Sequence, residues 1–167
     1  KGVVLLEAHE PAFGASGRNG GFVFGGFSLG EESLLRDLGV EKARALRAGT
    51  QEGIELIRER IEKHGIDCDA VNHGVLLANW FKDPTVLRGR QALLSEAYGQ
   101  DLTWIPEAVL REQVLTGRYY DALFEPDAFH FHPLKYANGL TRSAQALGVQ
   151  VFGQSPAVRL EQRGQGW

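Results

Sequence analysis

The opening of the chain joins a short apolar run directly to a glycine-rich segment, and this join constrains the fold more than any other feature. The run GVVLLEA (2–8) is typical of a strand that is covered on both faces, as in a parallel sheet. Residues 11–30 then hold seven glycines interleaved with four phenylalanines. A strand followed by a backbone that can take unusual conformations indicates an α/β fold.

Further along the chain, apolar spacing and Pro or Gly punctuation predict most of the remaining elements. A turn ending in glycine at 72–74 predicts a β-hairpin of two short strands. Gly49 and Gly53, one turn apart in a helical pattern, favour either a close contact on that face or a kink. We expect helices over 41–63, 84–98, 106–115 and 133–147, and strands at 149–152 and 157–167.

Charge and composition exclude several classes of function. The net charge of -3 and the pI near 6.0 give no basic patch for nucleic acid. No apolar run is long enough to span a bilayer. Cys68 is the only cysteine, so we expect no internal disulfide, a small buried residue at this position, and a reducing, cytoplasmic compartment.

The first apolar run ends at Glu7, which is a candidate for hydrogen bonding to a ligand. In a doubly wound fold, an acid at the end of the second strand can accept hydrogen bonds from the hydroxyls of a ribose. The alternative is a solvent-facing acid beyond a buried strand. The small residues that follow would let backbone N–H groups reach a pyrophosphate, or they would only shape a structural turn. The stretch suited to a dinucleotide is Ala15, Ser16, Gly17, Arg18, Asn19, Gly20 and Gly21.

The usual dinucleotide fingerprint, G-x-G-x-x-G, does not occur before Glu7, and no G-K-[ST] of a P-loop is present. If Glu7 ends the second strand, then the first strand and its phosphate-binding turn precede Lys1. The chain also contains no methionine. We therefore expect a piece of a longer protein.

Three segments together carry a resemblance to a known family: VVLLEAHEPAFGASGRNGGFV, HGVLLAN and HPLKYANGLTRSAQALGVQVF. In this order they resemble the D-amino-acid-oxidase-type (DAO) family of FAD-dependent oxidoreductases. The likeness is greatest to the amine oxidases that are similar to gamma-glutamylputrescine oxidase. GASGRNGG is the most specific piece, and the match runs over nearly the whole chain.

The resemblance implies an α/β fold with an α+β part. The chain would contain a partial FAD/NAD(P)-binding, Rossmann-like domain and part of a mixed-sheet substrate domain. Residues 1–65 and 132–167 would form the cofactor lobe and 66–131 the substrate lobe. Glu7 resembles the acid that holds the ribose of FAD, residues 15–17 the segment along the pyrophosphate, and residues 18–21 the segment near the isoalloxazine. Val158, in the strand after the returning helix, resembles the residue whose main chain meets adenine.

The implied activity is oxidation of a small-molecule amine or amino acid, with hydride transfer to FAD. The resemblance assigns no catalytic residue, and the piece as it stands would neither retain FAD nor turn over. The alternative is a non-catalytic α/β interaction module, in which the glycine-rich stretch is only structural.

Other candidate residues have a structural alternative that we favour. His130 and His132 with Asp127 suggest a metal cluster, but a role in helix entry is the better interpretation, and we expect no metal. Tyr119 and Tyr120 would line a substrate pocket or, more simply, pack in the core. His73 and the acid pairs Glu31-Glu32 and Asp67-Asp69 are expected in solvated turns.

Overall fold

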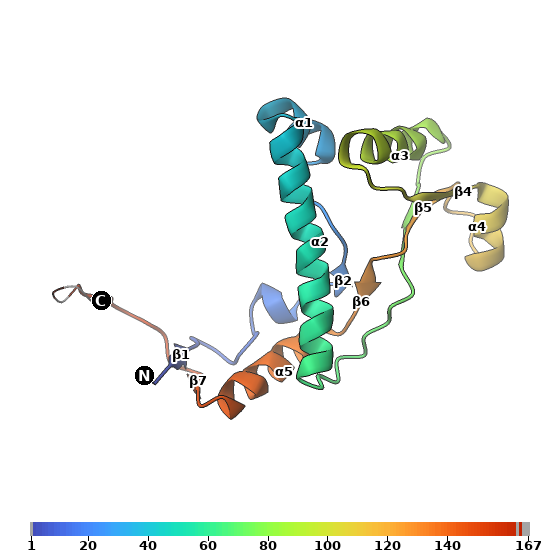
Figure 1. Ribbon diagram of the computed structural model, residues 1–167. Helices are drawn as coiled ribbons and strands as arrows, with labels where there is room; N and C mark the ends of the chain where they lie inside the picture. Colours follow the sequence, from blue (N-terminus) through green and yellow to red (C-terminus); the bar gives the residue numbers. More distant parts are fainter. Residues whose placement is uncertain (1, 163, 165–167) are drawn as a thin grey trace. The chain divides into compact units, whose positions relative to one another are not determined.

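The computed structural model describes residues 2–162 and 164, and the chain forms two compact units (Figure 1). Unit 1 contains 1–21, 59–70 and 131–167, and unit 2 contains 22–58 and 71–130. The mixed α/β fold predicted from the sequence is confirmed. The expected cofactor and substrate lobes stay a prediction, because compactness does not identify the role of a unit.

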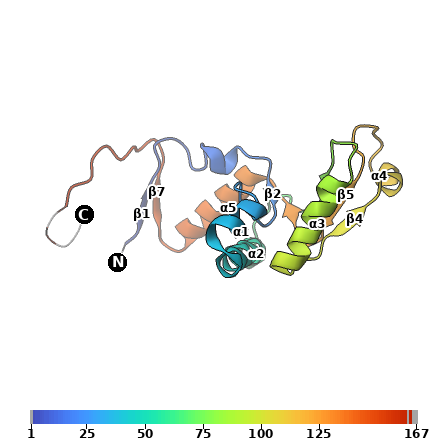
Figure 2. The ribbon, with the colours of Figure 1, turned by 90° about the horizontal axis from the view of Figure 1, so that it is seen from above.

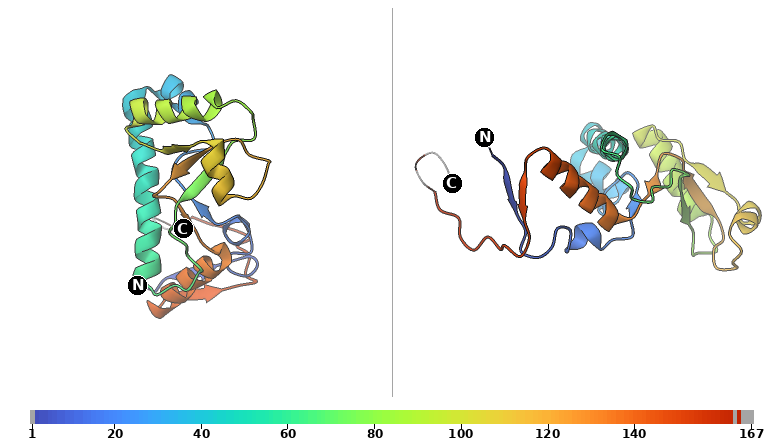
Figure 3. Two further views of the ribbon diagram at one scale, coloured as in Figure 1. Left: turned by 90° about the vertical axis from the view of Figure 1, so that its right-hand side faces the viewer. Right: turned by 90° about the horizontal axis from the view of Figure 1, so that it is seen from below.

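Unit 1 is built around a parallel pair of strands. β1 (Val4–Leu6) pairs with β7 (Gln150–Phe152), with Val4 opposite Gln150 and Leu6 opposite Phe152. The two strands lie side by side in Figures 2 and 3. Both were predicted as strands, but the described residues do not provide the expected cover for β1, since Val4, Leu5 and Leu6 are 53%, 45% and 53% exposed.

The helix α5 (Pro133–Ala146) precedes β7, and it begins and ends where the sequence predicts. Pro133 suits the first helical turn, and Gly148 follows the helix with φ of 89°. Gly139 on α5 lets Ile66 approach, because a Cβ there would overlap the Ile66 side chain. The adjacent Cys68 is buried, as expected, and its carbonyl accepts the His132 N–H at 2.7 Å.

Unit 2 contains a three-stranded antiparallel sheet in the order β3-β5-β4. Side chains alternate between the faces of β5. Leu123 packs with Leu87 and Leu94 of α3, whereas Ala122 packs with Leu110 of α4, so the two helices cover opposite faces (Figure 3). The bounds are β3 (Val75–Ala78), α3 (Thr85–Tyr98), β4 (Thr103–Ile105), α4 (Glu107–Gln113) and β5 (Ala122–Glu125).

The remaining elements are the 3₁₀ helix η1, two helices and a second antiparallel pair. The helices are α1 (Glu31–Leu38) and α2 (Val40–Lys63). β2 (Phe22–Val23) pairs with β6 (Phe129–His130), and η1 spans Ala15–Gly17. None of the described residues lies within 4 Å of the Cβ positions of Gly49 and Gly53, so the close contact considered for that face of α2 is wrong within this part of the chain.

Two predictions of strands fail. The hairpin at 72–74 does not form, because Val71 pairs with His130 while β3 pairs with β5. No strand occurs at 157–162, and 163 and 165–167 lie outside the described residues. A local turn signal cannot identify a partner strand that lies about fifty residues away in the sequence.

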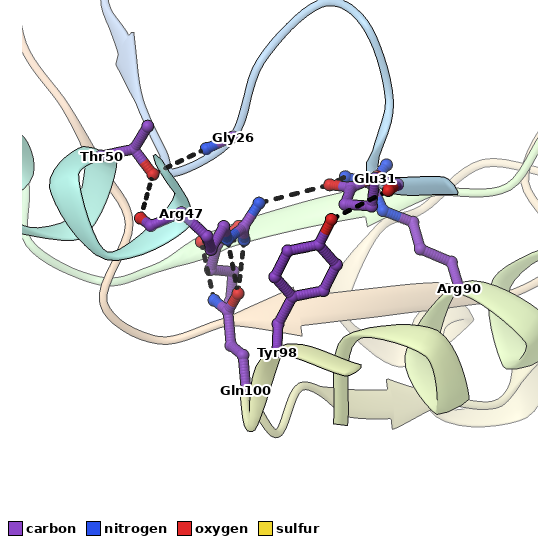
Figure 4. Close-up of polar contacts among 8 residues, drawn as sticks. Gly26, Glu31, Arg47, Thr50, Arg90, Tyr98 and Gln100 are labelled. Atoms are coloured by element: carbon purple, nitrogen blue, oxygen red, sulfur yellow. Dashed lines mark hydrogen bonds and ion pairs between the residues drawn. The ribbon is translucent and has the colours of Figure 1, made fainter. Parts of the chain in front are cut away.

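A buried polar cluster in unit 2 joins α1, α2 and α3 to β5 (Figure 4). Arg47 of α2, whose side chain is 7% exposed, forms ion pairs with Glu31 at 3.2 Å and with Glu125 at 3.8 Å. Its Nε also donates to the Gln100 side-chain oxygen at 2.9 Å, and Arg90 reaches Glu31 at 3.0 Å. The prediction that Glu31 lies in a solvated turn is therefore wrong.

Candidate cofactor site

Glu7 lies directly after the carboxyl end of β1, in the parallel pair with β7. Its N–H donates to the Phe152 carbonyl at 2.9 Å, and its carbonyl accepts the Ser155 N–H at 2.8 Å. One carboxylate oxygen accepts the His9 N–H at 3.0 Å. The half-buried carboxylate is thus held by its own turn at the strand tip, which is the place where open parallel sheets bind ligands.

The loop after Glu7 is closed by its own hydrogen bonds. In η1, Gly17 N–H donates to Gly14 O at 3.3 Å and Arg18 N–H donates to Ala15 O at 3.2 Å. The first amides of such a turn, those of Ala15 and Ser16, have no partner within the helix. Of the small residues proposed for a phosphate, Ala15 and Ser16 therefore have N–H groups that no bond within η1 uses, whereas the Gly17 N–H is bonded to Gly14 O.

The glycines of this loop differ in whether their surroundings exclude a side chain. A Cβ at Gly17 would overlap the Ala12 carbonyl, and a Cβ at Gly21, where φ is 72°, would overlap the Phe131 carbonyl. These two glycines therefore permit close packing of the protein on itself. Gly14 has nothing within 4 Å of its Cβ position and offers open backbone. The small residues of the loop thus serve both a structural turn and an accessible surface.

The side chain of Asn19 stabilises the loop. Its Nδ2 donates to Ala15 O at 3.0 Å and to Ser16 O at 3.2 Å, and its Oδ1 accepts the Gly21 N–H at 2.8 Å. Arg18 instead places its guanidinium over the Phe13 ring, 4.0 Å from the centroid. The amide is therefore engaged by the backbone, while the exposed cation keeps its N–H donors on the loop surface.

A hollow of about 540 Å³ in unit 1 brings several of these residues together. Its volume lies in the range of small-molecule sites. Burial raises the pKa of the Tyr136 hydroxyl above its ordinary value, so this group stays protonated and can donate a hydrogen bond. The hollow is lined by Leu5, Glu7, Gly14, Ser16 and Asn19 from β1 and the loop, and by Tyr136, Ala137, Leu140 and Thr141 of α5.

The other predicted site residues do not line this hollow. Ala15, Gly17, Arg18, Gly20 and Gly21 belong to the same loop but are not among its lining residues. Val158 is 91% exposed and lies in irregular backbone, so its expected place in a strand is wrong; the strand after α5 is β7.

Sequence reasoning missed the residues that α5 contributes. Tyr136, Leu140 and Thr141 lie on one side of the helix at positions i, i+4 and i+5. In the sequence Leu140 belongs to an apolar stripe, which is normally assigned to the core, and Tyr136 and Thr141 lie outside the residues assigned to that stripe. The hydroxyl of Thr141, next to Leu140, was the signal in the sequence that could have indicated a ligand-facing wall on this helix.

Two of the residues considered for other chemistry, His132 and Tyr119, have structural roles. His132 precedes α5 and its Nδ1 accepts the Lys135 N–H at 3.5 Å, which confirms the helix-entry interpretation. Tyr119 packs edge-on against Trp80 with centroids 5.0 Å apart and contacts the core beside α4. Among the described residues, no group of three or more His, Cys, Asp or Glu is placed to bind a metal ion.

Comparison with known proteins gives consistent matches along the chain. The model of the DAO family, described as FAD dependent oxidoreductase, matches residues 1–167. The probable oxidoreductase OrdL of Haemophilus influenzae is 33% identical over 165 residues, which are 98% of this chain and 38% of that protein. The gamma-glutamylputrescine oxidoreductase of Escherichia coli is 32% identical and is matched over 95% of this chain and 37% of its own length.

Solved structures share the fold at lower identity. The L-amino acid deaminase of Proteus myxofaciens has a TM-score of 0.71 at 22% identity and covers 98% of this chain and 35% of its own. The glycine oxidase of Bacillus cereus has a TM-score of 0.66 at 18% identity, with coverage of 96% and 42%. The chain thus spans about 38% of the curated relatives it matches. None of the described helices has the length and apolar character needed to cross a membrane.

Proposed function

Because the chain belongs to the DAO family of FAD-dependent oxidoreductases, we propose that the whole protein oxidises a primary or secondary amine, or an amino acid. Two observations support this substrate class: the family itself and the 32% identity to a gamma-glutamylputrescine oxidoreductase. Family membership also favours an enzyme over the alternative of an interaction module. A cytoplasmic location, expected from the single buried cysteine, remains part of the proposal.

The observation that carries the proposal is the hollow around Glu7. It combines a carboxylate at the tip of a parallel strand, open backbone at Gly14, and the protonated hydroxyl of Tyr136. A ribose presents hydroxyl donors that suit a carboxylate, and a pyrophosphate requires a backbone without bulky side chains. The residues present therefore fit the nucleotide part of FAD.

We assign the following roles toward the cofactor. Glu7 would accept hydrogen bonds from the ribose hydroxyls, and the amides of Ala15 and Ser16 would face the pyrophosphate. Asn19 would keep the loop in shape through its three hydrogen bonds with the backbone. Acceptance of a hydride from the carbon next to the amine nitrogen is the chemistry that bound FAD would supply, and water would hydrolyse the imine product.

The exposed faces of β1 and β7 support one further part of the proposal. A two-stranded parallel sheet with exposed apolar side chains is unusual, because parallel sheets are normally covered on both faces. We infer that other segments of the whole protein cover these faces and complete the cofactor lobe. Residues 1–65 and 132–167 would then belong to that lobe, and 66–131 to the substrate lobe.

The first experiment measures flavin in the whole protein. The purified protein should be yellow and should bleach when its amine is added without oxygen. Screening candidate amines for peroxide release would then define the substrate, and reduction of an artificial acceptor would serve if oxygen is not the acceptor. A colourless protein after purification with excess FAD would contradict the proposal.

A pair of variants tests the role of Glu7. Glu7→Gln should weaken FAD binding about tenfold to a hundredfold, because a hydrogen bond to a charged group contributes roughly 1.5–3 kcal/mol. Glu10→Gln is the matched control: Glu10 is exposed and pairs with Gln154 at 3.2 Å. Fluorescence titration of the apoprotein with FAD measures both affinities. Equal affinities of the two variants would remove Glu7 from the ribose site.

A further inference from the structure

The pair of strands β2 and β6 carries two rings on its exposed face. Phe22 lies directly opposite His130 in this antiparallel pair, so the two side chains share a face, and their ring centroids are 6.4 Å apart. The neighbouring Val23 and Phe129 point to the other face and are only 8% and 0% exposed, whereas Phe22 is 63% exposed. The pair therefore presents an aromatic surface on the side away from the core.

The three-stranded sheet of unit 2 supplies a second apolar surface. Leu76 of β3 lies opposite Phe124 of β5, and both pack on the side of the sheet that α4 covers. A Cβ at Gly74, where φ is 77°, would overlap the Phe124 ring. Glycine at this position therefore allows the ring to lie against the backbone of the turn before β3.

These two surfaces line one hollow of about 340 Å³ within unit 2. Its volume lies in the range of small-molecule sites. The polar side chains that line it are those of His73, His130 and Gln113, and none of its described lining residues is an acid, a lysine or an arginine. The hollow shares no described lining residue with the one around Glu7.

The three polar side chains are accessible to a ligand. His73, His130 and Gln113 are all exposed, and within the described part of the chain their side chains form no hydrogen bond. The backbone of His130 is held in place, because its N–H donates to the Val71 carbonyl at 3.3 Å and its carbonyl accepts the Val71 N–H at 2.9 Å. Gln113 is the last residue of α4.

The chemistry of the lining favours an uncharged ligand that has both donors and acceptors. An ion would lose its hydration without meeting an opposite charge, and this loss is costly. A neutral imidazole and an amide each offer a donor and an acceptor, which match the N–H and C=O groups of a carboxamide. The rings of Phe22 and Phe124 suit an aromatic body.

We propose that this hollow binds a small, uncharged aromatic amide. The aromatic ring packs against Phe22 and Phe124, and the carboxamide exchanges hydrogen bonds with His130 and Gln113. The site contains no residue to which we assign a role toward FAD, so binding can be measured whether or not the protein holds flavin, and the two proposals can fail independently.

The test compares three probes of similar shape and different charge on the whole protein. Phenylacetamide is neutral, phenylacetate is an anion and phenylacetamidinium is a cation. In these probes no carbon that bears nitrogen carries hydrogen, so none can be oxidised to an imine. Isothermal titration calorimetry at pH 8 should give a Kd of roughly 1 mM or below for phenylacetamide. This affinity should be at least about fivefold higher than that for either ion.

Variants separate the polar contacts from the aromatic ones. His130→Leu should weaken the binding of phenylacetamide at least about fivefold, because a hydrogen bond is lost. His64→Leu, which changes an exposed histidine directly after α2, is the matched control and should bind as the wild type does. Phe22→Ala should weaken all three probes several-fold, since contact with a ring does not depend on the charge of the probe.

Circular dichroism melting checks that each variant folds, and Gln113→Leu, at the exposed end of α4, replaces His130→Leu if that variant does not fold. The proposal is overturned if the wild type does not bind phenylacetamide or if either ion binds as tightly. It is also overturned if His130→Leu or its replacement binds as tightly as His64→Leu, or if Phe22→Ala binds the probes as the wild type does.

Discussion

Gly21 is the residue at which the loop after β1 tolerates least change. Its φ of 72° and the Phe131 carbonyl beside its Cβ position both exclude a side chain. Gly21→Ala should therefore lower the free energy of unfolding by about 2 kcal/mol or more. Gly14→Ala is the matched control within the same loop, with φ of -76° and open space, and should cost less than about 0.5 kcal/mol. Urea unfolding of the whole protein measures both, and equal values would contradict the packing role of Gly21.

Arg47 holds two acids in the buried cluster of unit 2. Arg47→Met should destabilise the protein by about 3 kcal/mol, because Glu125 loses this ion pair in a buried place while Glu31 keeps only Arg90. Arg36→Met removes an arginine from an exposed pair with Asp37 and should cost at most about 1 kcal/mol. Thermal unfolding compares the two, and a small effect at Arg47 would show that the cluster is hydrated.

Cys68 should be slow to react in the folded protein. Burial, and then the charges of Asp67 and Asp69, raise the pKa of its thiol above the ordinary value. The thiolate is the reactive form, so alkylation of residue 68 at pH 8 should be slow in the native protein and fast in urea. Since the folded pKa is the higher one, this group's contribution to stability is complete below the ordinary pKa of a thiol and is lost as the pH rises through the folded pKa. Peptide mass spectrometry follows the labelling, and rapid native labelling would contradict this prediction.

At the scale of elements, four of the five α-helices in the described residues were predictable because their signals are local, whereas α1 was not expected. Proline, glycine and apolar spacing placed α2, α3, α4 and α5 within a few residues of their observed bounds. Asp83 accepts the Thr85 N–H at 2.9 Å at the entry to α3. Partners of strands were not predictable, because the pairing of Val71 with His130 depends on contacts between distant segments.

The burial of charged side chains also depends on contacts between distant segments, so local signals did not predict it. Glu31 was expected in a solvated turn, and nothing in the sequence marks Arg47 as buried, because charged residues are mostly exposed. Their burial results from the meeting of α1, α2, α3 and β5 around one guanidinium, as Figure 4 shows. For the candidate site, the sequence predicted Glu7 at the strand tip and a loop of small residues, but not the wall that α5 provides.

At the scale of the whole chain, the uncovered parallel pair should make residues 1–167 associate when produced alone. Exposed apolar strands with free edges promote pairing between copies. Leu6→Lys on β1 should reduce this association, because a charged side chain on an edge strand opposes pairing. Leu56→Lys on α2 is the control, with a similar exposure of 44% against 53% for Leu6. Sedimentation velocity measures both, and a monomeric wild-type chain would contradict the prediction.

The pairing of β1 with β7 also has a consequence for synthesis. Val4 lies opposite Gln150, which is 146 positions further along the chain. At translation rates of roughly 5–20 residues per second, β1 waits about 7 to 30 s after it is made before β7 exists. During this interval the aliphatic side chains of β1 lack their native partner strand, and a pause in translation before β7 would prolong the interval.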